Sequence, residues 1–338
     1  MATQRVTWLD YAKAISITLV VMMHSVRGVG DAMGGVGFMH AFVDFTDPFR
    51  IPTFFLLAGL LVPRAVEKSW AVLWDRKVLF YVYFYVLWTF IQFAFKAPLS
   101  LPNFELLTIA HALGLAFANP DTTLWFIAVL PVYFVIAKST KDAPAWLVLG
   151  AAFVLLAAPI DTSWRLLDYG SNGLFYFVLG QRAAPYIFAT ADELRGNGMG
   201  AVGFLAAWAV VAMATLSLSA APGLSALFAL LGGAAVIAIS VLLERAPAMA
   251  WLRWVGRNTL VIYLAFFLPM AVTRIVLVKL GIFEEVGVVS LIVWLAAMIG
   301  PVSMYFTTRR VGFGRFLFER PQWASLASRH RPLTQAAE

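Results

Sequence analysis

Four ionisable residues interrupt an apolar stretch near the N-terminus, VTWLDYAKAISITLVVMMHSVRG, which runs from Val6 to Gly28. They are Asp10, Lys13, His24 and Arg27. At ~100° per residue, all four fall within one helical sector about 100° wide, and the opposite side is apolar. Ionisable side chains inside a membrane are costly, and they usually pair with one another or mark a functional path. The stripe is therefore predicted to face the interior of a helical bundle.

Each member of the stripe has a chemical and a structural interpretation. A neutral imidazole at His24 can accept a hydroxyl proton near neutral pH, which suits a general base; the alternative is a hydrogen bond to a neighbouring helix. Asp10 and Lys13 are three residues apart and can form a local ion pair; the alternative is a pair of snorkelling anchors at a helix end. His24 lies roughly 20 Å along the axis from Asp10.

The composition indicates a membrane protein that crosses the bilayer several times. Of the 338 residues, 62% are hydrophobic and 13% are charged, whereas soluble proteins average roughly 45–50% and about 25%. The sequence contains no cysteine, which excludes disulfides and thiolate chemistry. The apolar run at 14–23 has no small-residue cleavage site after it, so we expect a retained helix rather than a signal peptide.

Ten apolar runs are long enough to cross a hydrocarbon core of ~30 Å at ~1.5 Å per residue. A further run at 104–118 contains Glu105 and His111 and is predicted to be interfacial or re-entrant. The ten predicted spans are 7–29, 50–66, 77–96, 123–138, 143–160, 171–188, 200–220, 223–243, 258–280 and 286–306.

The distribution of basic residues predicts the orientation. If the N-terminus is cytoplasmic, most of the 25 Lys and Arg residues fall in the inner loops and the tail, as the positive-inside rule expects. Both termini are then cytoplasmic. The net charge of +7 reflects topology, and no nucleic-acid partner is expected. Six cations fall toward the outer side: Arg27, Arg50, Lys96, Arg165, Arg274 and Lys279.

The first segment resembles a family of membrane enzymes. LDYAKAISITLVVMMHS is similar to the first helix of the acyltransferase-3 family of integral membrane O-acyltransferases, which includes bacterial sugar O-acetylases. That family has a basic residue, usually Arg, then ten residues, then His. Lys13 and His24 have this spacing, with Lys in place of Arg, as in a branch similar to fucose 4-O-acetylases.

Five further segments match the family in order: PFRIPTFFLLAGLLV, DRKVLFYVY, TLWFIAVL, FYFVLGQ and VGRNTLVIYLAFF. In the first of these segments Ala58 stands where Ser is usual, and in the last the family's His is replaced by Ala265 or Phe266. The likeness covers about residues 7–306, and ten helices is the family's usual number.

The resemblance implies transfer of an acyl group, usually acetyl, from cytoplasmic acyl-CoA to a hydroxyl. His24 would activate that hydroxyl or carry the acyl group. Lys13 would contact CoA phosphates or hold Asp10. Arg76 and Lys77 would bind CoA phosphates at an inner helix end; the alternative is ordinary positive-inside charge.

Other candidate binding residues have weaker support. Arg50 and Arg27 could stabilise an oxyanion near His24, or they could snorkel. Trp125, beside Phe126, could stack on adenine or a sugar, or it could belong to an interfacial aromatic belt. Two polar residues, Asn258 and Tyr263, could serve the site or hold helices together. The loop DTSWRLLDYG suits carbohydrate, or is simply solvated.

The sequence therefore predicts an all-α, polytopic membrane helical bundle of about ten spans with an acyltransferase-3-like domain at 1–310 and a short basic cytoplasmic tail at 311–338. The expected partners are acetyl-CoA, a sugar or glycan acceptor and the bacterial inner membrane. No metal site is expected, because the four histidines are too dispersed. The alternatives are a transporter or flippase of a small anion or lipid-linked sugar, and a non-catalytic membrane subunit. The acceptor and the oligomeric state stay open.

Overall fold

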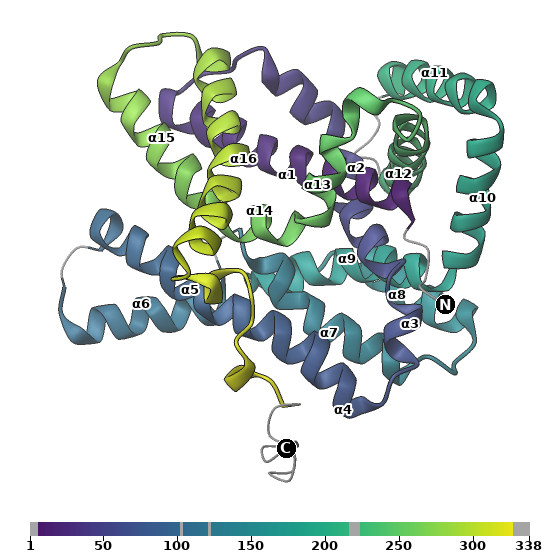
Figure 1. The fold of residues 1–338 in the computed structure, drawn as a ribbon, viewed down its shortest axis with the longest axis horizontal. Helices are drawn as coiled ribbons and strands as arrows, with labels where there is room; N and C mark the ends of the chain where they lie inside the picture. The colour runs from purple at the N-terminus through teal and green to yellow at the C-terminus, as the bar shows by residue number, and fades with distance from the viewer. Residues whose placement is uncertain (1–5, 102–103, 121–122, 216–223, 327–338) are drawn as a thin grey trace.

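The computed structural model describes residues 6–101, 104–120, 123–215 and 224–326, and every regular element within these ranges is helical (Figure 1). The last part of the predicted tail, 327–338, lies outside the described residues. The elements are α1 (Thr7–Met33), α2 (Met39–Gly59), α3 (Pro63–Val66), α4 (Trp70–Leu73), η1 (Trp74–Val78), α5 (Leu79–Ser100), α6 (Leu106–Ala118), α7 (Trp125–Ser139), α8 (Ala145–Ala157), α9 (Arg165–Arg182), α10 (Ala184–Gly196), α11 (Gly198–Thr215), α12 (Leu224–Leu243), η3 (Pro247–Met249), α13 (Trp251–Arg257), α14 (Thr259–Ala265), α15 (Phe267–Leu280), α16 (Val286–Val311), η4 (Arg315–Leu317) and η5 (Gln322–Ala324).

Helix α1 is the central element of the bundle. It packs against α2, α12, α13 and α16, and both its polar and its apolar sides are largely buried, with Trp8, Ile17 and Val21 fully enclosed. The helix ends at Gly34, whose left-handed backbone (φ 65°) lets its N–H bond back to the Gly30 carbonyl. A short turn then leads into α2. The segment 30–49, which lies between the first two predicted spans, is therefore mostly helix.

Helices α2 and α9 touch through their backbones. A Cβ atom at Gly180 would overlap the carbonyl oxygen of Leu56 on α2, so only glycine permits this separation. Small residues at helix interfaces allow such close approach in membrane bundles. The contact fixes α9 against α2, and both helices supply side chains to the cavity described below.

Each of the ten predicted spans overlaps at least one helix, and the predicted interfacial segment overlaps α6. The span 171–188 is divided between α9 and α10, and the span 258–280 between α14 and α15. Residues 216–220 and 223 of two further spans lie outside the described residues. Within the described residues, α1, the α4–α5 segment, α12 and α16 are long and apolar enough to cross a membrane. The number rises to six if each of two bent pairs counts as one span: α10 with α11, bent by 110°, and α14 with α15, bent by 45°. Helices α6, α7 and α8 are apolar but shorter. The all-helical class is confirmed, while ten spans and cytoplasmic termini stay predictions.

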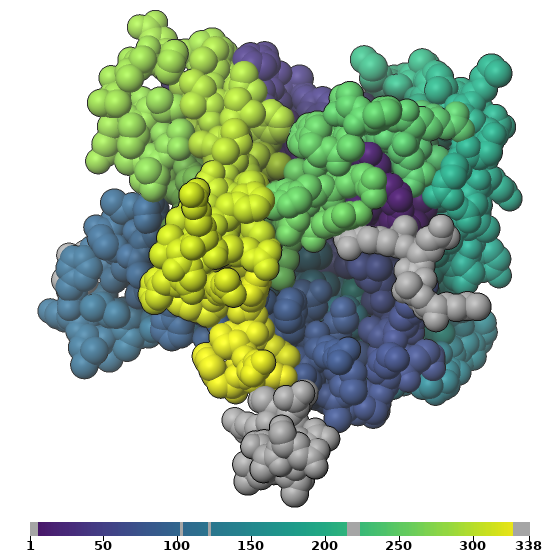
Figure 2. Space-filling model, in the orientation of Figure 1, coloured from purple at the N-terminus to yellow at the C-terminus, as the bar shows by residue number. Residues whose placement is uncertain are grey.

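After α16 the chain turns back as a strap, residues 315–326, that lies on α5 (Figure 2). The Trp88 indole N–H donates to the Leu317 carbonyl at 2.9 Å, and the Tyr83 hydroxyl donates to the Phe316 carbonyl at 3.0 Å. These bonds satisfy the polar ends of two aromatic side chains and attach the strap to the helix that follows η1.

Candidate active site

His24 lies in the wall of a cavity of about 1030 Å³, named here the His24 cavity. Its walls come from α1, α2, α5, α7, α8, α9, α12, α14 and α15. Five residues singled out from the sequence besides His24 line it: Arg27, Arg50, Trp125, Phe126 and Tyr263. The first-helix stripe thus faces the bundle interior at this end, as its spacing predicted.

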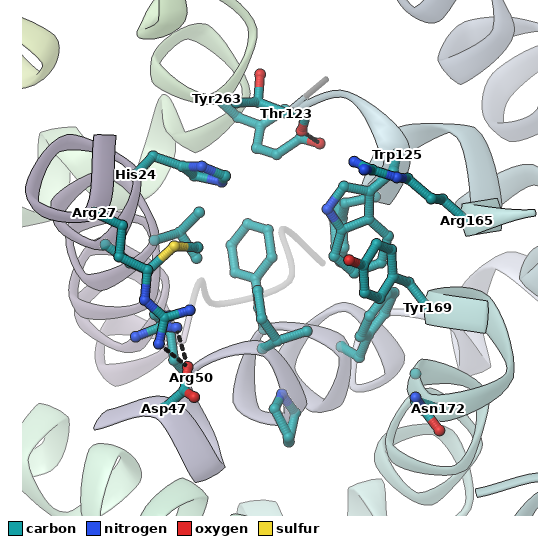
Figure 3. A pocket seen from close by; sticks show the side chains of 18 of the residues that line it. His24, Arg27, Asp47, Arg50, Thr123, Trp125, Arg165, Tyr169, Asn172 and Tyr263 are labelled. Carbon is teal, nitrogen blue, oxygen red and sulfur yellow. Dashed lines mark hydrogen bonds and ion pairs between the residues drawn. The ribbon is translucent and has the colours of Figure 1, made fainter. Parts of the chain in front are cut away.

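The His24 ring is open to an incoming group. It projects from α1 into the cavity (Figure 3), and its ring centroid lies 5.5 Å from that of Phe266. Neither ring nitrogen has a hydrogen-bond partner among the residues that the structure describes. A bond to a neighbouring helix, the structural alternative for His24, is therefore not seen in this part of the chain. The imidazole can face a hydroxyl substrate, and its role as a base stays a prediction.

Two guanidinium groups share one carboxylate beside His24. Buried Arg50 contacts Asp47 through Nη2 at 2.5 Å, and its Nη1 donates to the Val43 carbonyl at 3.1 Å and to Thr46 Oγ1 at 3.2 Å. Half-exposed Arg27 reaches the same Asp47 oxygen at 3.3 Å. These contacts hold both arginines at the cavity wall (Figure 3). Arg50 is buried and does not extend toward solvent as a snorkelling side chain would, and its role in binding stays a prediction.

The opposite wall is built by the start of α7 and the first turns of α9. The rings of Trp125 and Tyr169 lie 5.2 Å apart, and Arg165 projects beside them (Figure 3). The sequence placed Arg165 and Tyr169 in a loop that suits carbohydrate, and the structure puts them on a helix that faces His24. Aromatic faces beside polar side chains are a suitable surface for a sugar ring.

Three aromatic residues, Phe54, Phe126 and Tyr263, form the floor of the His24 cavity and are called here the aromatic trio. Ring centroids lie 4.5 Å apart for Phe54 and Phe126, and 5.8 Å apart for Phe126 and Tyr263. The Tyr263 hydroxyl donates to the Thr123 carbonyl. The same three residues line a second cavity of about 200 Å³, which also contains Lys13 and Lys77 and is named the Lys13 cavity. The trio therefore separates the two.

Asp10 joins two cations at the other end of α1. Its side chain is 3% exposed, and its oxygens lie 3.9 Å from Lys13 Nζ and 3.2 Å from Arg257 Nε. Arg257 can reach it because Gly256 packs directly on the Asp10 carbonyl, where a Cβ would overlap. The Asp10–Lys13 pair predicted from spacing is present. Arg257, its nearer partner, was missed, because the two residues are far apart in the sequence.

Two more cavities lie near this end of α1. The Asp10 cavity, about 880 Å³, is lined by Asp10, Lys13 and Arg64 among others. The Arg76 cavity, about 500 Å³, is strongly basic. Its charged lining residues are Arg64, Lys68, Arg76, Lys77 and Arg320. Neighbouring cavities share lining residues, with Lys13 common to two and Lys77 common to two.

Comparison with known proteins identifies the bundle. A family model described as an acyltransferase domain matches residues 6–307, nearly the whole chain. The chain belongs to the acyltransferase-3 family. The match includes α1 to most of α16, so it covers all four cavities except for Arg320 on the strap.

One curated relative of this acyltransferase-3 protein is the inner membrane protein YcfT of Escherichia coli strain K12. It is 24% identical over 217 residues, which cover 56% of this chain and 60% of the relative. The alignment thus spans less than two thirds of the relative's length. No solved structure matches.

Within this acyltransferase-3 bundle, Arg76 and Lys77 lie on the π-helical turn η1. Lys77 Nζ lies 5.1 Å above the Phe134 ring. Asp75, on the same turn, is anchored to the strap. Arg320 donates from Nη2 to the Asp75 carboxylate at 2.9 Å, and the Leu326 N–H donates to it at 2.8 Å. Single π-helical turns inside α-helices are frequent at functional sites.

The structure differs from expectation at Asn258 and at the position of the family's second histidine. Asn258 lines none of the four cavities. Its side-chain amide donates to the Trp254 carbonyl, four residues earlier in the chain, at 2.8 Å, so this bond is local and does not join two distant helices. The Phe266 ring lies beside the His24 ring, with the ring planes tilted by 37°. An apolar ring therefore occupies the position near which the family resemblance leads one to expect a second histidine.

Proposed function

We propose that this protein is a membrane O-acyltransferase that moves an acetyl group from cytoplasmic acetyl-CoA to a hydroxyl of a sugar or glycan at the outer side of the membrane. Family membership supports the reaction class. The main structural support is the pair of cavities on either side of the aromatic trio: one basic, for a phosphorylated donor, and one containing His24, for a hydroxyl acceptor.

The donor would bind at the Lys13 end of α1. The cations of the Arg76 cavity suit the phosphate groups of CoA, because guanidinium and ammonium groups form strong charge-assisted hydrogen bonds with phosphate. The thioester end would then extend through the Lys13 cavity toward the trio. The rings of the aromatic trio would present an apolar surface to the methyl group of the donor's acetyl group and would exclude water from the thioester.

The chemistry would occur at His24. Its imidazole takes the proton of the acceptor hydroxyl, and the hydroxyl oxygen attacks the thioester carbonyl carbon. The carbon–sulfur bond breaks, and the proton held by His24 passes to the departing CoA thiolate. Arg27 and Arg50 supply positive charge on the same wall, where the carbonyl oxygen becomes negative. The products are an acetyl ester and free CoA.

Replacement of His24 by alanine tests the proposal. A positioned general base contributes about 10²–10⁴-fold to the rate, so His24→Ala should lower acetyl transfer by that factor. The measurement is thiol release from acetyl-CoA by purified protein with membrane glycan extract as acceptor. His40, which accepts a backbone N–H in the turn before α2, gives the matched control His40→Ala. Full activity of His24→Ala would refute the assignment.

The same assay separates the proposal from the transporter or flippase alternative. A transporter would move its substrate without cleaving acetyl-CoA, so no thiol would appear. Thiol release that requires both His24 and the glycan extract supports acyl transfer. Substrate transport into vesicles without thiol release would support the alternative instead.

A further inference from the structure

The Arg76 cavity is built almost entirely by one short stretch of chain. Its charged lining residues come from the segment between α2 and α5, with the single exception of Arg320 on the strap. Helix α3 precedes a turn at 67–69, and α4 and η1 follow it. The shape of this turn therefore decides whether the cations before and after it face the same space. These cations are Arg64, Lys68, Arg76 and Lys77.

Local structure gives the turn little support. Helices α3 and α4 have four residues each, and helices of this length are marginal without tertiary contacts. Val62 and Val66 are buried in the core and fix the apolar side of α3. The chain from Glu67 to Trp70, by contrast, is exposed. The direction in which the chain leaves α3 therefore depends on a contact from another element.

Lys138, near the end of α7, supplies that contact. Its Nζ atom donates to the Val66 carbonyl at 2.6 Å and to the Lys68 carbonyl at 2.5 Å. The same atom lies 5.6 Å above the Trp70 ring. Val66 is the last residue of α3 and Trp70 is the first of α4, and α3 packs on α7 (Figure 1). One ammonium group thus joins α3, the turn and α4.

Membrane topology does not account for the burial of Lys138. The positive-inside rule requires a cation on the cytoplasmic side, and an exposed cation satisfies it equally well. Lys138 is only 9% exposed, and burial of an ammonium group costs free energy unless hydrogen bonds compensate. The carbonyl at the end of α3 provides such compensation, because the C-terminal end of a helix favours a positive charge.

The end of α7 is itself held in place. Arg182 on α9 donates from Nη1 to the Lys141 carbonyl at 3.0 Å and from Nη2 to the Thr140 carbonyl. Phe134 and Ala137, one turn and one residue before Lys138, are buried. Lys138 lines none of the four cavities. It is therefore placed to orient the residues of the Arg76 cavity rather than to contact a ligand there.

We propose that Lys138 is a positioning residue for the acyl donor, because its ammonium group holds the 66–70 turn so that the cations of the Arg76 cavity converge on the phosphate groups of CoA. This inference rests on the proposed function and adds to it a residue outside the cavities. Hydrogen bonds weaken steeply as the donor is displaced or misaligned. Loss of Lys138 weakens the contacts with phosphate and leaves the chemistry at His24 unchanged.

Two acyl donors separate positioning from a general loss of structure. Acetyl-CoA carries the phosphates, whereas S-acetylpantetheine has the same thioester and pantetheine arm without them. The measurement is kcat/KM for thiol release by purified protein with each donor, with membrane glycan extract as acceptor. Lys138→Met should lower the preference for acetyl-CoA over S-acetylpantetheine about tenfold, the factor expected for one lost charged hydrogen bond. The change should appear in KM for acetyl-CoA and not in kcat.

Three further variants serve as controls, and the thermal unfolding midpoint reports whether each is folded. Lys279→Met removes an exposed lysine that lines none of the four cavities and should keep the wild-type preference. Lys138→Arg keeps the charge and donors for both carbonyls, so it should retain more of the preference than Lys138→Met. Where Lys138→Met gives no folded protein, Lys138→Gln replaces it, since its amide still donates from a side chain one bond shorter.

A double variant tests whether the effect arises at the Arg76 cavity. Arg76→Gln removes one of the cations that Lys138 is proposed to position. If Lys138 acts through this cavity, the effects of Lys138→Met and Arg76→Gln on the donor preference should be less than additive. Full additivity would overturn the inference.

The remaining outcomes distinguish the inference from the proposed function. A wild-type preference in the folded Lys138→Met or Lys138→Gln variant overturns the inference alone. An equal loss of activity with both donors indicates a merely structural role and also overturns it. A wild-type protein that does not prefer acetyl-CoA overturns phosphate binding at the Arg76 cavity, and the inference with it. No thiol release from either donor by wild-type protein overturns the proposed function and everything that rests on it.

Discussion

At the scale of single residues, Asp10 is the anion that holds α13 against the first helix. Its carboxylate is almost fully buried, whereas Lys13 is 23% exposed and Arg257 is 41% exposed. Removal of a buried partner leaves cations facing each other without compensation. The exposure of both cations reduces that cost, because solvent screens them.

We therefore expect Asp10→Asn to destabilise the protein by about 1–2 kcal/mol. The measurement is the thermal unfolding midpoint of detergent-purified protein, which should fall by several degrees. Asp142→Asn is the matched control: its carboxylate is 86% exposed and, among the described residues, pairs only with its neighbour Lys141 at 3.5 Å. Equal midpoints for the two variants would show that the Asp10 contacts contribute nothing to stability.

At the scale of elements, the strap connects the C-terminal end of the bundle to the turn that carries Arg76 and Lys77. Both the carbonyl and the carboxylate of Asp75 bind Arg320, and the carboxylate also accepts from Ser325 and the Leu326 N–H. A π-helical turn has less regular hydrogen bonding than an α-helix. Its orientation therefore depends on these contacts.

We expect Asp75→Asn to loosen the strap and to raise KM for acetyl-CoA with a smaller change in kcat. The neutral amide keeps one acceptor oxygen but loses the charge that Arg320 pairs with. Limited trypsin digestion should cleave after Arg315 faster in this variant. Glu319→Gln removes an exposed ion pair with Arg309 and should digest like the wild type. Unchanged digestion and unchanged KM in Asp75→Asn would contradict a positioning role.

At the scale of the whole molecule, the first helix lines three of the four cavities, from the Asp10 end to the His24 end, and the Arg76 cavity shares lining residues with two of these three. The arrangement suits transfer across a bilayer only if these two ends face opposite sides of the membrane. That orientation comes from the distribution of Lys and Arg and stays a prediction.

The absence of cysteine makes the orientation simple to test, because each introduced cysteine is the only one. Asp142→Cys lies between α7 and α8 on the predicted inner side, and Glu284→Cys lies between α15 and α16 on the predicted outer side. A membrane-impermeant maleimide added to intact spheroplasts should label Glu284→Cys alone. Labelling of Asp142→Cys instead would reverse the topology and place His24 toward the cytoplasm.

Local patterns in the sequence located most of the helices and placed the polar residues of α1 on a common face, but they missed the first part of α2, which lies before the second predicted span. Apolar runs locate helices because a bilayer requires every backbone polar group to be bonded within its own segment. The spacing of Asp10, Lys13 and His24 predicts a common face because helical geometry is regular. The family motifs likewise marked Trp125, Phe126 and Tyr263, all of which line the His24 cavity.

Contacts between distant segments were decided only by the tertiary structure. Asp10 meets Arg257 because Gly256 allows two backbones to touch, and nothing local to either residue indicates it. Six cations are predicted toward the outer side, and each looks isolated in the sequence. Helix packing brings five of them to the His24 cavity: Arg27, Arg50, Lys96, Arg165 and Arg274. Periodicity follows from the geometry of one helix, but a cavity and its charge depend on which faces of several helices pack together.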